Sequence, residues 1–229
     1  MIATPRLVRV PPFERGITLG DFLVPIRVGE RATSRQRHLL MIGIGVLLIF
    51  VGARLSFYLP DNPFVPVSLQ TFGVLFGSAL LGFRRAILAV AVYLVLGVVG
   101  LPVFAYDATT DAYRSGLATI VTVQQGDIIL GGTGGYLLGF LAAAALVGRL
   151  AELGWDRNVP GSLLAMALGN ALIYAIGLPW LALAADFEFQ TALARGLYPF
   201  VAFDLLKLAL AAGLMPLGWW LVRRRSSER

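Results

Sequence analysis

The sequence predicts an all-α integral membrane protein, a bundle of six transmembrane helices with both termini in the cytoplasm. Of its 229 residues, 58% are hydrophobic and only 14% are charged, whereas roughly 25% of the residues of a soluble domain carry a charge. The mean hydropathy is +0.78. The apolar residues gather in six segments, and the basic residues cluster in every second connection between them. Both observations indicate helices that cross a bilayer.

Each of the six segments is about as long as a membrane crossing requires. A helix rises about 1.5 Å per residue, so roughly 20 residues cross a hydrocarbon core of about 30 Å. The second segment is the shortest and is rich in glycine. The predicted spans cover residues 39–59, 67–82, 86–105, 134–150, 160–181 and 198–222.

Prolines and glycines mark where these helices begin and end. The prolines of the run 63–71 cannot continue the first helix and predict an extended entry into the second. Gly73 and Gly77 form a small pair four residues apart that lets the second helix approach a neighbour closely. The connection 106–131 is long for a compact bundle, and we expect it to be a lid or a disordered segment.

The charge distribution fixes the orientation and divides the chain into three parts. Fifteen of the 19 lysines and arginines lie on the side that holds both termini, which the positive-inside rule assigns to the cytoplasm. We expect residues 1–38 to be a basic, partly disordered cytoplasmic arm without the apolar core of a signal peptide. Residues 39–222 are the predicted membrane domain, and 223–229 are a basic cytoplasmic tail. The net charge of +6 is therefore a topology signal and does not indicate nucleic-acid binding.

Several classes of function are excluded by residues that the sequence lacks. There are no cysteines, and His38 is the only histidine, so neither a zinc site nor a thiol nucleophile is expected. A phosphate-binding loop needs a lysine after its glycines, but Tyr136 follows Gly131-Gly-Thr-Gly-Gly135. The sequence has no nucleophile paired with a base either. We therefore predict that the chain is not an enzyme, uses no cofactor and does not power its own transport.

The most informative pair of residues is Asp204 and Lys207, the only lysine of the chain, within the last apolar segment. An ionisable group at that depth costs roughly 2.5–3.5 kcal/mol on insertion scales, so it needs a partner, a water-filled cavity or a function. At i and i+3 the two side chains share one face of the helix. Two interpretations stay open here: a charge pair that ties the helix to its neighbours, or a polar binding site inside the membrane.

Other polar and aromatic residues are candidates for the same site. Ser68, Gln70 and Thr71 place hydrogen-bonding groups at the outer mouth of the bundle, although Ser68 could simply cap a helix. Asn170 and Tyr174 lie one turn apart, and ordinary interhelical hydrogen bonds would explain them as well as a ligand. Four aromatic residues could pack on an apolar ligand or belong to the core: Tyr93, Phe104, Tyr136 and Phe140.

Four motifs in order give the chain a resemblance to a known family. They are Pro66-Val-Ser-Leu-Gln-Thr71, Tyr93-x-x-x-Gly-x-x-Gly-Leu-Pro-Val-Phe104, Gly132-Thr-Gly-Gly-Tyr-x-x-Gly-Phe140 and Pro199-Phe-x-x-x-Asp-x-x-Lys207. Together they resemble the biotin transporter family, BioY, whose members are the substrate-binding S components of energy-coupling factor transporters. The resemblance covers roughly residues 40–222 and leaves the first 38 residues outside.

This resemblance implies a six-helix protein in the cell membrane of a prokaryote that captures biotin from the outside. The implied partners are biotin, a transmembrane coupling (T) subunit, cytoplasmic ATP-binding subunits and the lipid bilayer, but no nucleic acid. The Asp-x-x-Lys pair of the family's last helix contributes to the biotin pocket, which carries over to Asp204 and Lys207. The expected biotin-binding residues are Asp204, Lys207, Gln70, Thr71, Tyr93, Phe104, Tyr136 and Asn170.

Two alternatives remain open, two features depart from the family pattern, and one further residue is unusual. The substrate could be another vitamin, such as lipoate or thiamine, or the chain could be a solitary carrier that works without ATPases. The loop after Phe104 is longer than the family pattern, so contacts of that loop cannot be carried over. The first helix lacks the alanine pair expected for docking on the coupling subunit. Arg54, near the outer end of that helix, is unusual: it either meets the biotin carboxylate or extends to the interface.

Overall fold

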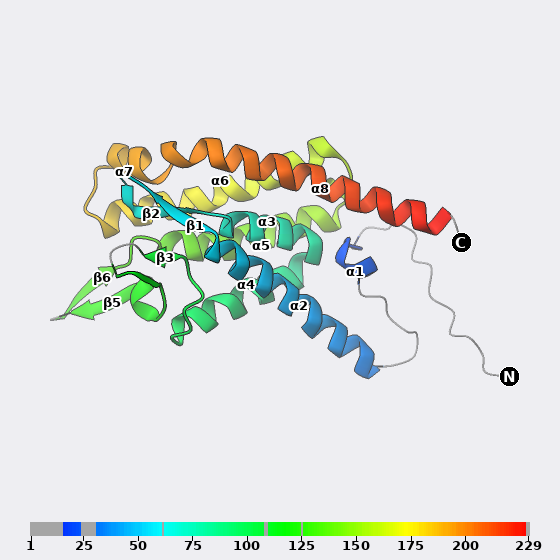
Figure 1. The fold of residues 1–229 in the computed structure, drawn as a ribbon, viewed down its shortest axis with the longest axis horizontal. Coiled ribbons are helices and arrows are strands. Elements are labelled where there is room, and N and C mark those ends of the chain that lie inside the picture. Colours follow the sequence, from blue (N-terminus) through cyan, green and yellow to red (C-terminus); the bar gives the residue numbers. More distant parts are fainter. Residues whose placement is uncertain (1–15, 24–30, 61, 108–109, 125, 228–229) are drawn as a thin grey trace.

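The structure is a computed structural model that describes residues 16–23, 31–60, 62–107, 110–124 and 126–227. Helices run side by side along its length, with short strands at one end and, at the other, α1 and the last turns of the helix that ends at Ser227 (Figure 1). Parts of the predicted N-terminal arm, 1–15 and 24–30, lie outside the described residues. So do Asp61 and the last two residues of the predicted C-terminal tail.

Each predicted span contains a helix. The six helices that correspond to the predicted spans are α2 (Arg31–Arg54), α3 (Gln70–Leu81), α4 (Phe83–Val98), α5 (Gly134–Glu152), α6 (Val159–Ala184) and α8 (Val201–Ser227). The described residues also form a short helix at the N-terminal side, α1 (Gly20–Leu23), and a helix that the sequence analysis did not predict, α7 (Phe189–Gly196). Helix α7 joins α8 through the 3₁₀ turn η3 (Tyr198–Phe200).

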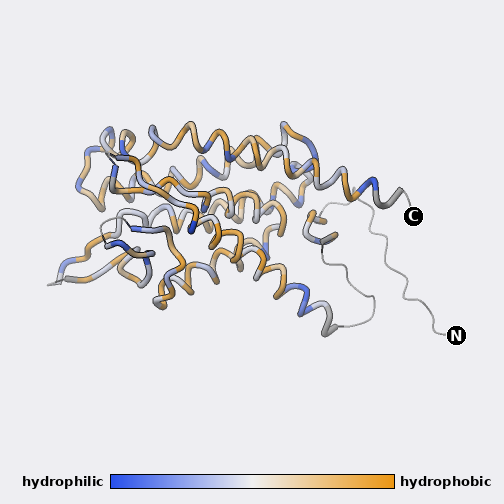
Figure 2. The backbone as a smooth tube through the Cα atoms, in the orientation of Figure 1, coloured by the Kyte–Doolittle hydropathy of each residue, from blue (hydrophilic) through white to orange (hydrophobic). Residues whose placement is uncertain are grey.

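The helices differ in whether they are long enough to cross a bilayer unaided. Among the described residues, four apolar helical segments have that length: Ser34–Arg54, Gly134–Glu152, Val159–Ala184 and Phe189–Arg224. Helix α3 has 12 residues and α4 has 16, which is short of the roughly 20 residues of a full crossing. Hydrophobic residues dominate the middle of the long helices, and hydrophilic residues concentrate toward their ends (Figure 2). The protein is therefore a mostly helical membrane protein with four long apolar helices and several shorter ones.

The prediction of an all-α fold is wrong at one end of the bundle, where three antiparallel hairpins lie (Figure 1). The long connection expected to be a lid or a disordered segment contains two of them together with the 3₁₀ turn η1 (Leu117–Thr119). The strands are too short for an alternation of apolar and polar residues to be recognised in the sequence. The hairpins are β1 (Ser56–Leu59) with β2 (Asn62–Ser68), β3 (Tyr106–Asp107) with β4 (Ala112–Tyr113), and β5 (Val121–Gln124) with β6 (Asp127–Leu130).

Two helices end earlier than predicted, and each has a local reason. The first span was predicted to reach residue 59, but α2 ends at Arg54 and Ser56 pairs with Ser68 across β1 and β2. The third was predicted to reach residue 105, but α4 ends at Val98. Gly100 then adopts φ +107, a left-handed conformation that favours glycine, and Pro102 cannot continue a helix. Residues that hydropathy assigned to helices thus form the outer end of the protein.

Helix α5 lies at the centre of the bundle and packs against α3, α4 and α6. Of the two glycines of α3 that were predicted to allow close helix packing, the structure requires one. A Cβ atom on Gly73 would lie 2.6 Å from the backbone oxygen of Leu48 in α2, whereas one on Gly77 would meet only a side-chain methyl at 3.7 Å. Gly73 therefore permits the close approach of α2 and α3, because no side chain fits between the backbones.

Part of the predicted arm packs against the end of the bundle opposite the hairpins. Leu19 is buried there, and the ring of Phe22 meets Trp219 edge to face at 5.6 Å. The Asp21 carboxylate lies 2.6 Å from Arg37 and 2.9 Å from Arg85. Burial raises the pKa of Asp21, but a backbone hydrogen bond and the two arginines outweigh it, so the pKa is lowered overall. This ion pair holds α1 against α2 and α4.

Candidate ligand-binding site

A cavity lies inside the bundle at the end that carries the hairpins. The space in and around it amounts to about 650 Å³, a figure that includes open solvent. Its walls come from β2, α3, α5, α6, α7, η3 and α8, and from the loops before β3, after β4 and before α5. Ligand sites with mostly apolar walls and a few convergent polar groups are the common pattern, and this cavity has both.

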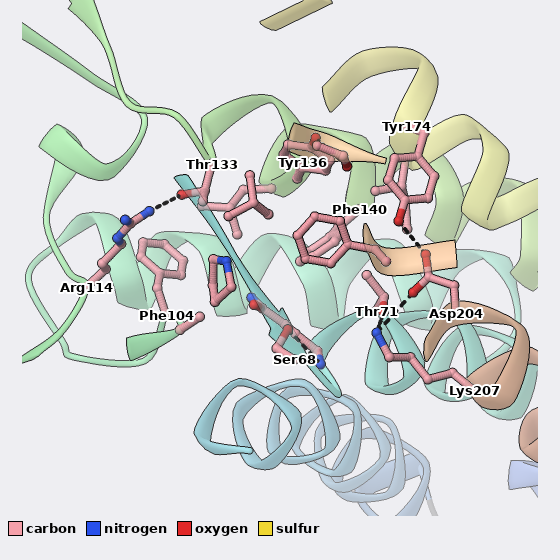
Figure 3. A pocket seen from close by; sticks show the side chains of 18 residues that line it. Ser68, Thr71, Phe104, Arg114, Thr133, Tyr136, Phe140, Tyr174, Asp204 and Lys207 are labelled. Carbon is pink, nitrogen blue, oxygen red and sulfur yellow. Dashed lines mark hydrogen bonds and ion pairs between the residues drawn. The ribbon is translucent and has the colours of Figure 1, made fainter. Parts of the chain in front are cut away.

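The polar end of the cavity is built around Asp204 and Lys207 of α8 (Figure 3). Lys207 Nζ lies 3.0 Å from Asp204 Oδ1, and the two side chains are only 9% and 6% exposed. Lys207 also donates to Thr71 Oγ1 of α3 at 3.2 Å. Asp204 Oδ2 accepts from Asn170 Nδ2 at 3.1 Å and from the Tyr174 hydroxyl, both on α6. A buried ion pair needs such additional hydrogen bonds to offset its desolvation.

The hydrogen-bonding groups of this end are not all used by the protein. Asp204 Oδ1 accepts only from Lys207 among the described residues, so it retains a lone pair. Lys207 has three protons and uses two, on Asp204 and on Thr71. Thr71 accepts from Lys207 and keeps its own hydroxyl proton for another acceptor. The pair therefore joins three helices, and together with Thr71 it leaves one acceptor and two donors for a ligand.

Aromatic rings form the walls between this end and the mouth. Phe104, Tyr136 and Phe140 all line the cavity (Figure 3). The Tyr136 hydroxyl donates to the Gly196 carbonyl at 3.1 Å, so the ring of Tyr136 is held in place by its own polar atom. Gly97 of α4 makes room for the Phe104 ring, because a Cβ atom on Gly97 would lie 2.0 Å from the tip of that ring. The walls therefore suit an apolar ring system.

Gly97→Ala should reduce ligand affinity at least about tenfold. Phe104 is 1% exposed and packs on Tyr93, so an added methyl group displaces its ring toward the cavity, as overpacking of a close-packed interior does. Binding is measured on the purified protein by equilibrium titration. Gly213→Ala is the matched control, since its Cβ would meet nothing within 4 Å. Unchanged affinity in Gly97→Ala would show that Phe104 does not shape the ligand's space.

The opposite end of the cavity carries one cationic side chain, Arg114, which follows β4. Its Nε lies 2.9 Å from Asp107 Oδ2, and its NH1 donates to Thr133 Oγ1 at 3.1 Å. Arg114 and the Asp204–Lys207 pair lie on opposite sides of Phe140 in the close view (Figure 3). Since a guanidinium has five N–H donors, Arg114 can hold Asp107 and Thr133 and still bind an anionic group. The cavity thus has a polar group at each end and apolar walls between them.

Six of the eight predicted site residues line this cavity: Gln70, Thr71, Phe104, Tyr136, Asp204 and Lys207. The other two, Tyr93 and Asn170, lie behind the lining. Tyr93 accepts a hydrogen bond from Gln70, and Asn170 donates to Asp204. Both therefore act on residues that line the cavity rather than on its contents.

The sequence analysis missed Arg114 and Thr133 as members of the site, and it left Tyr174, which lines the cavity, between a ligand contact and an ordinary interhelical hydrogen bond. Arg114 could have been found as one of the few basic residues on the otherwise acidic outer side, but its loop gave no spacing to place it. Arg54, which was weighed as a ligand contact, does not line the cavity. It donates to the Pro102 carbonyl at 2.6 Å and lies over the Tyr113 ring at 3.7 Å.

Comparison with known proteins decides the family. The model of the BioY family matches residues 28–224 of the chain. The chain belongs to the BioY family. The match begins eleven residues before the predicted membrane domain, so the end of the predicted N-terminal arm falls within the family region.

Curated BioY relatives cover most of the chain. The biotin transporter BioY of Thermotoga maritima is 38% identical over 177 residues, which are 77% of this chain and 92% of that protein. The biotin transporter BioY of Rhodobacter capsulatus is 31% identical over 191 residues, 76% of this chain and 89% of that protein. Membership of BioY confirms the prediction of a transporter-family protein rather than an enzyme.

A solved structure has the same fold. The crystal structure of the S-component for biotin from an ECF-type ABC transporter superimposes with a TM-score of 0.68 at 24% identity, covering 82% of this chain and 93% of that chain. At this identity the likeness concerns the fold. The BioY chain therefore has the S-component fold, with hairpins at one end of a helical bundle.

Proposed function

We propose that the protein is the substrate-binding S component of a biotin uptake transporter and captures biotin from the outer side of the membrane. The observation that carries this proposal is the cavity with two different polar ends. Biotin has a ureido ring at one end, an apolar thiolane fused to it, and a chain that ends in a carboxylate. The BioY relatives named above are biotin transporters, which supports the same substrate.

The ureido ring fits the Asp204–Lys207 end. The ring offers two N–H donors and one carbonyl acceptor. The free lone pair of Asp204 Oδ1 accepts one N–H, and the unused protons of Lys207 and Thr71 donate to the carbonyl. The ion pair is neutral as a whole, which suits a neutral head group.

The carboxylate of the chain fits the Arg114 end. An arginine binds a carboxylate through charge-assisted hydrogen bonds and often in a bidentate manner. Phe104 and Phe140 would then pack along the thiolane and the methylene chain. This orientation also separates biotin from the other vitamins considered. Lipoate has no N–H or carbonyl head for the ion pair, and the positive charge of thiamine would meet Arg114.

The proposed topology is six crossings with both termini in the cytoplasm of a prokaryotic cell. The supporting observation is the charge bias: Arg84, Arg85 and Arg149 lie beside α1, at the end of the bundle opposite the hairpins, where α8 also ends with a basic run. The short helices α3 and α4 would cross with the help of the hairpins and loops that extend them. Because the sequence lacks a phosphate-binding loop, we propose that a transmembrane coupling subunit and cytoplasmic ATP-binding subunits supply the energy.

Saturable binding of labelled biotin to the purified chain, without any partner, tests the proposal. We expect one biotin per chain and a larger thermal stabilisation by biotin than by lipoate or thiamine. A ligand at 100 times its Kd stabilises the folded state by about 2.7 kcal/mol, so the shift is measurable. The proposal fails if biotin gives no saturable binding or if another vitamin stabilises more. Uptake in cells that lack every coupling subunit would favour a solitary carrier instead.

A further inference from the structure

Behind the cavity wall, a chain of two hydrogen bonds connects Gln70 to the backbone. Gln70 Nε2 lies 2.8 Å from the Tyr93 hydroxyl, and the Tyr93 hydroxyl lies 2.7 Å from the carbonyl oxygen of Val103. Tyr93 is fully buried, and Gln70 is 4% exposed and lines the cavity. These contacts join α3, α4 and the segment that follows α4.

The proton of Tyr93 decides which way the Gln70 amide points. A carbonyl oxygen can only accept, so the single hydroxyl proton of Tyr93 is donated to Val103. The Tyr93 oxygen must then accept from Gln70, and only the NH₂ group of Gln70 can donate to it. The flipped amide would set two acceptors against each other with no proton between them. The orientation follows from this count and does not depend on distinguishing nitrogen from oxygen.

The consequence is a fixed acceptor on the cavity wall. No described residue donates a hydrogen bond to Gln70 Oε1, and Gln70 is next to Thr71, which bonds to Lys207. We infer that Tyr93 is a positioning residue: it orients the Gln70 amide so that Oε1 accepts a hydrogen bond from an N–H group of the ligand. This inference rests on the proposed function and assigns Tyr93 a role without ligand contact.

The inference explains why a tyrosine occupies this buried position. The Tyr93 ring packs edge to face on Phe104 with centroids 5.6 Å apart, and a phenylalanine would make the same contact. The hydroxyl group adds only the link between Gln70 and Val103. If that link fixes the acceptor before the ligand arrives, the ligand need not order the Gln70 side chain on binding.

A double-mutant cycle tests the inference. Tyr93→Phe removes the hydroxyl group that links Gln70 to Val103, and Gln70→Met removes the acceptor Oε1. Each substitution keeps a side chain of similar volume. Each single variant should bind biotin about 3- to 10-fold more weakly, the range for one neutral hydrogen bond. Because Tyr93 acts through Gln70, Tyr93→Phe should change affinity less than about twofold in the Gln70→Met background, as coupled residues do. Thermal unfolding midpoints verify that all variants are folded.

Two results of the cycle would overturn the inference. Equal losses from Tyr93→Phe in both backgrounds would show that Tyr93 acts through packing or through Val103. No loss from Tyr93→Phe in the wild-type background would show that Gln70 needs no orientation. A purely structural tyrosine predicts the first of these results, so the cycle separates the two roles.

A measurement without ligand keeps this inference separate from the proposed function. In ¹⁵N-glutamine-labelled protein, the side-chain amide signals of Gln70 are assigned by their loss in Gln70→Met. We expect one of its two protons to exchange slowly with water in the wild type and rapidly in Tyr93→Phe. If wild-type protein binds no biotin, the proposed function fails, and these signals still decide the orientation. Rapid exchange of both Gln70 side-chain protons in the wild type would overturn the inferred orientation of the amide.

Discussion

Neutralising both members of the buried ion pair, Asp204→Asn with Lys207→Met, should weaken biotin binding at least about 100-fold while the protein stays folded. The ligand would lose two hydrogen bonds to charged groups, and each contributes about 1.5–3 kcal/mol. Together they correspond to two or more orders of magnitude in affinity. Either single substitution leaves an uncompensated buried charge and should also destabilise the fold by about 3–5 kcal/mol. The double variant avoids that second effect, and equilibrium binding measures the first.

The matched control is the other i,i+3 ion pair of the described helices, Arg149 with Glu152, whose nitrogen and oxygen also lie 3.0 Å apart. Arg149→Met with Glu152→Gln makes the same chemical change outside the cavity and should leave biotin affinity unchanged. The glutamine can still accept from the Phe83 amide, as Glu152 does. Full-affinity binding by the Asp204→Asn, Lys207→Met variant would support the other interpretation of the pair, that it only ties α8 to α3 and α6.

Arg114→Gln should weaken biotin binding about 10- to 100-fold and remove the preference for a free carboxylate. The glutamine can still donate to Asp107 or Thr133 but no longer carries a charge, so the hydrogen bond to a carboxylate loses its charge-assisted part. Biotin amide, whose tail is neutral, should bind wild type and variant with similar affinity. Competition of both ligands against labelled biotin measures the difference.

Arg54→Gln is the control for this experiment. Arg54 lies at the same end of the bundle but bonds to Pro102 and stacks on Tyr113 rather than lining the cavity. Its substitution should not change the ratio of biotin to biotin-amide affinity. If Arg114→Gln weakens both ligands equally, the tail carboxylate is not bound at Arg114, and the proposed orientation of biotin is wrong.

The sequence predicted the helices well where hydropathy alone decides. A helix lies in each of the six predicted spans, because a long apolar segment in a bilayer must satisfy its backbone groups internally. At the outer ends of the first and third spans, the same hydropathy gave a wrong prediction of where the helices end. Residues 55–59 and 99–105 are apolar enough to continue a span, yet pairing with β2 and the conformation of Gly100 end the helices earlier.

The candidate site was predictable in part for a similar reason. Asp204 and Lys207 stand out because an ionisable residue in an apolar segment is rare and costly. Gln70 and Tyr93 were candidates because of their residue types, and both also lie in the family motifs, but nothing in their spacing indicates that one orients the other. Arg114 was not predicted as a site residue, because an arginine in a loop is ordinary until its neighbours are known.

By itself, the sequence determined the class of protein, its helical segments and the ion pair of the last helix, because these follow from the free energy of placing each side chain in a bilayer. That free energy depends on the residues of one short segment and does not require knowledge of how the segments pack together. Only the tertiary structure decided that Asp204 and Lys207 face Arg114 across an apolar cavity and that Tyr93 holds Gln70 from behind. Those relations join residues from α3, α4, α8 and the loop after β4, and the packing of these elements brings them together.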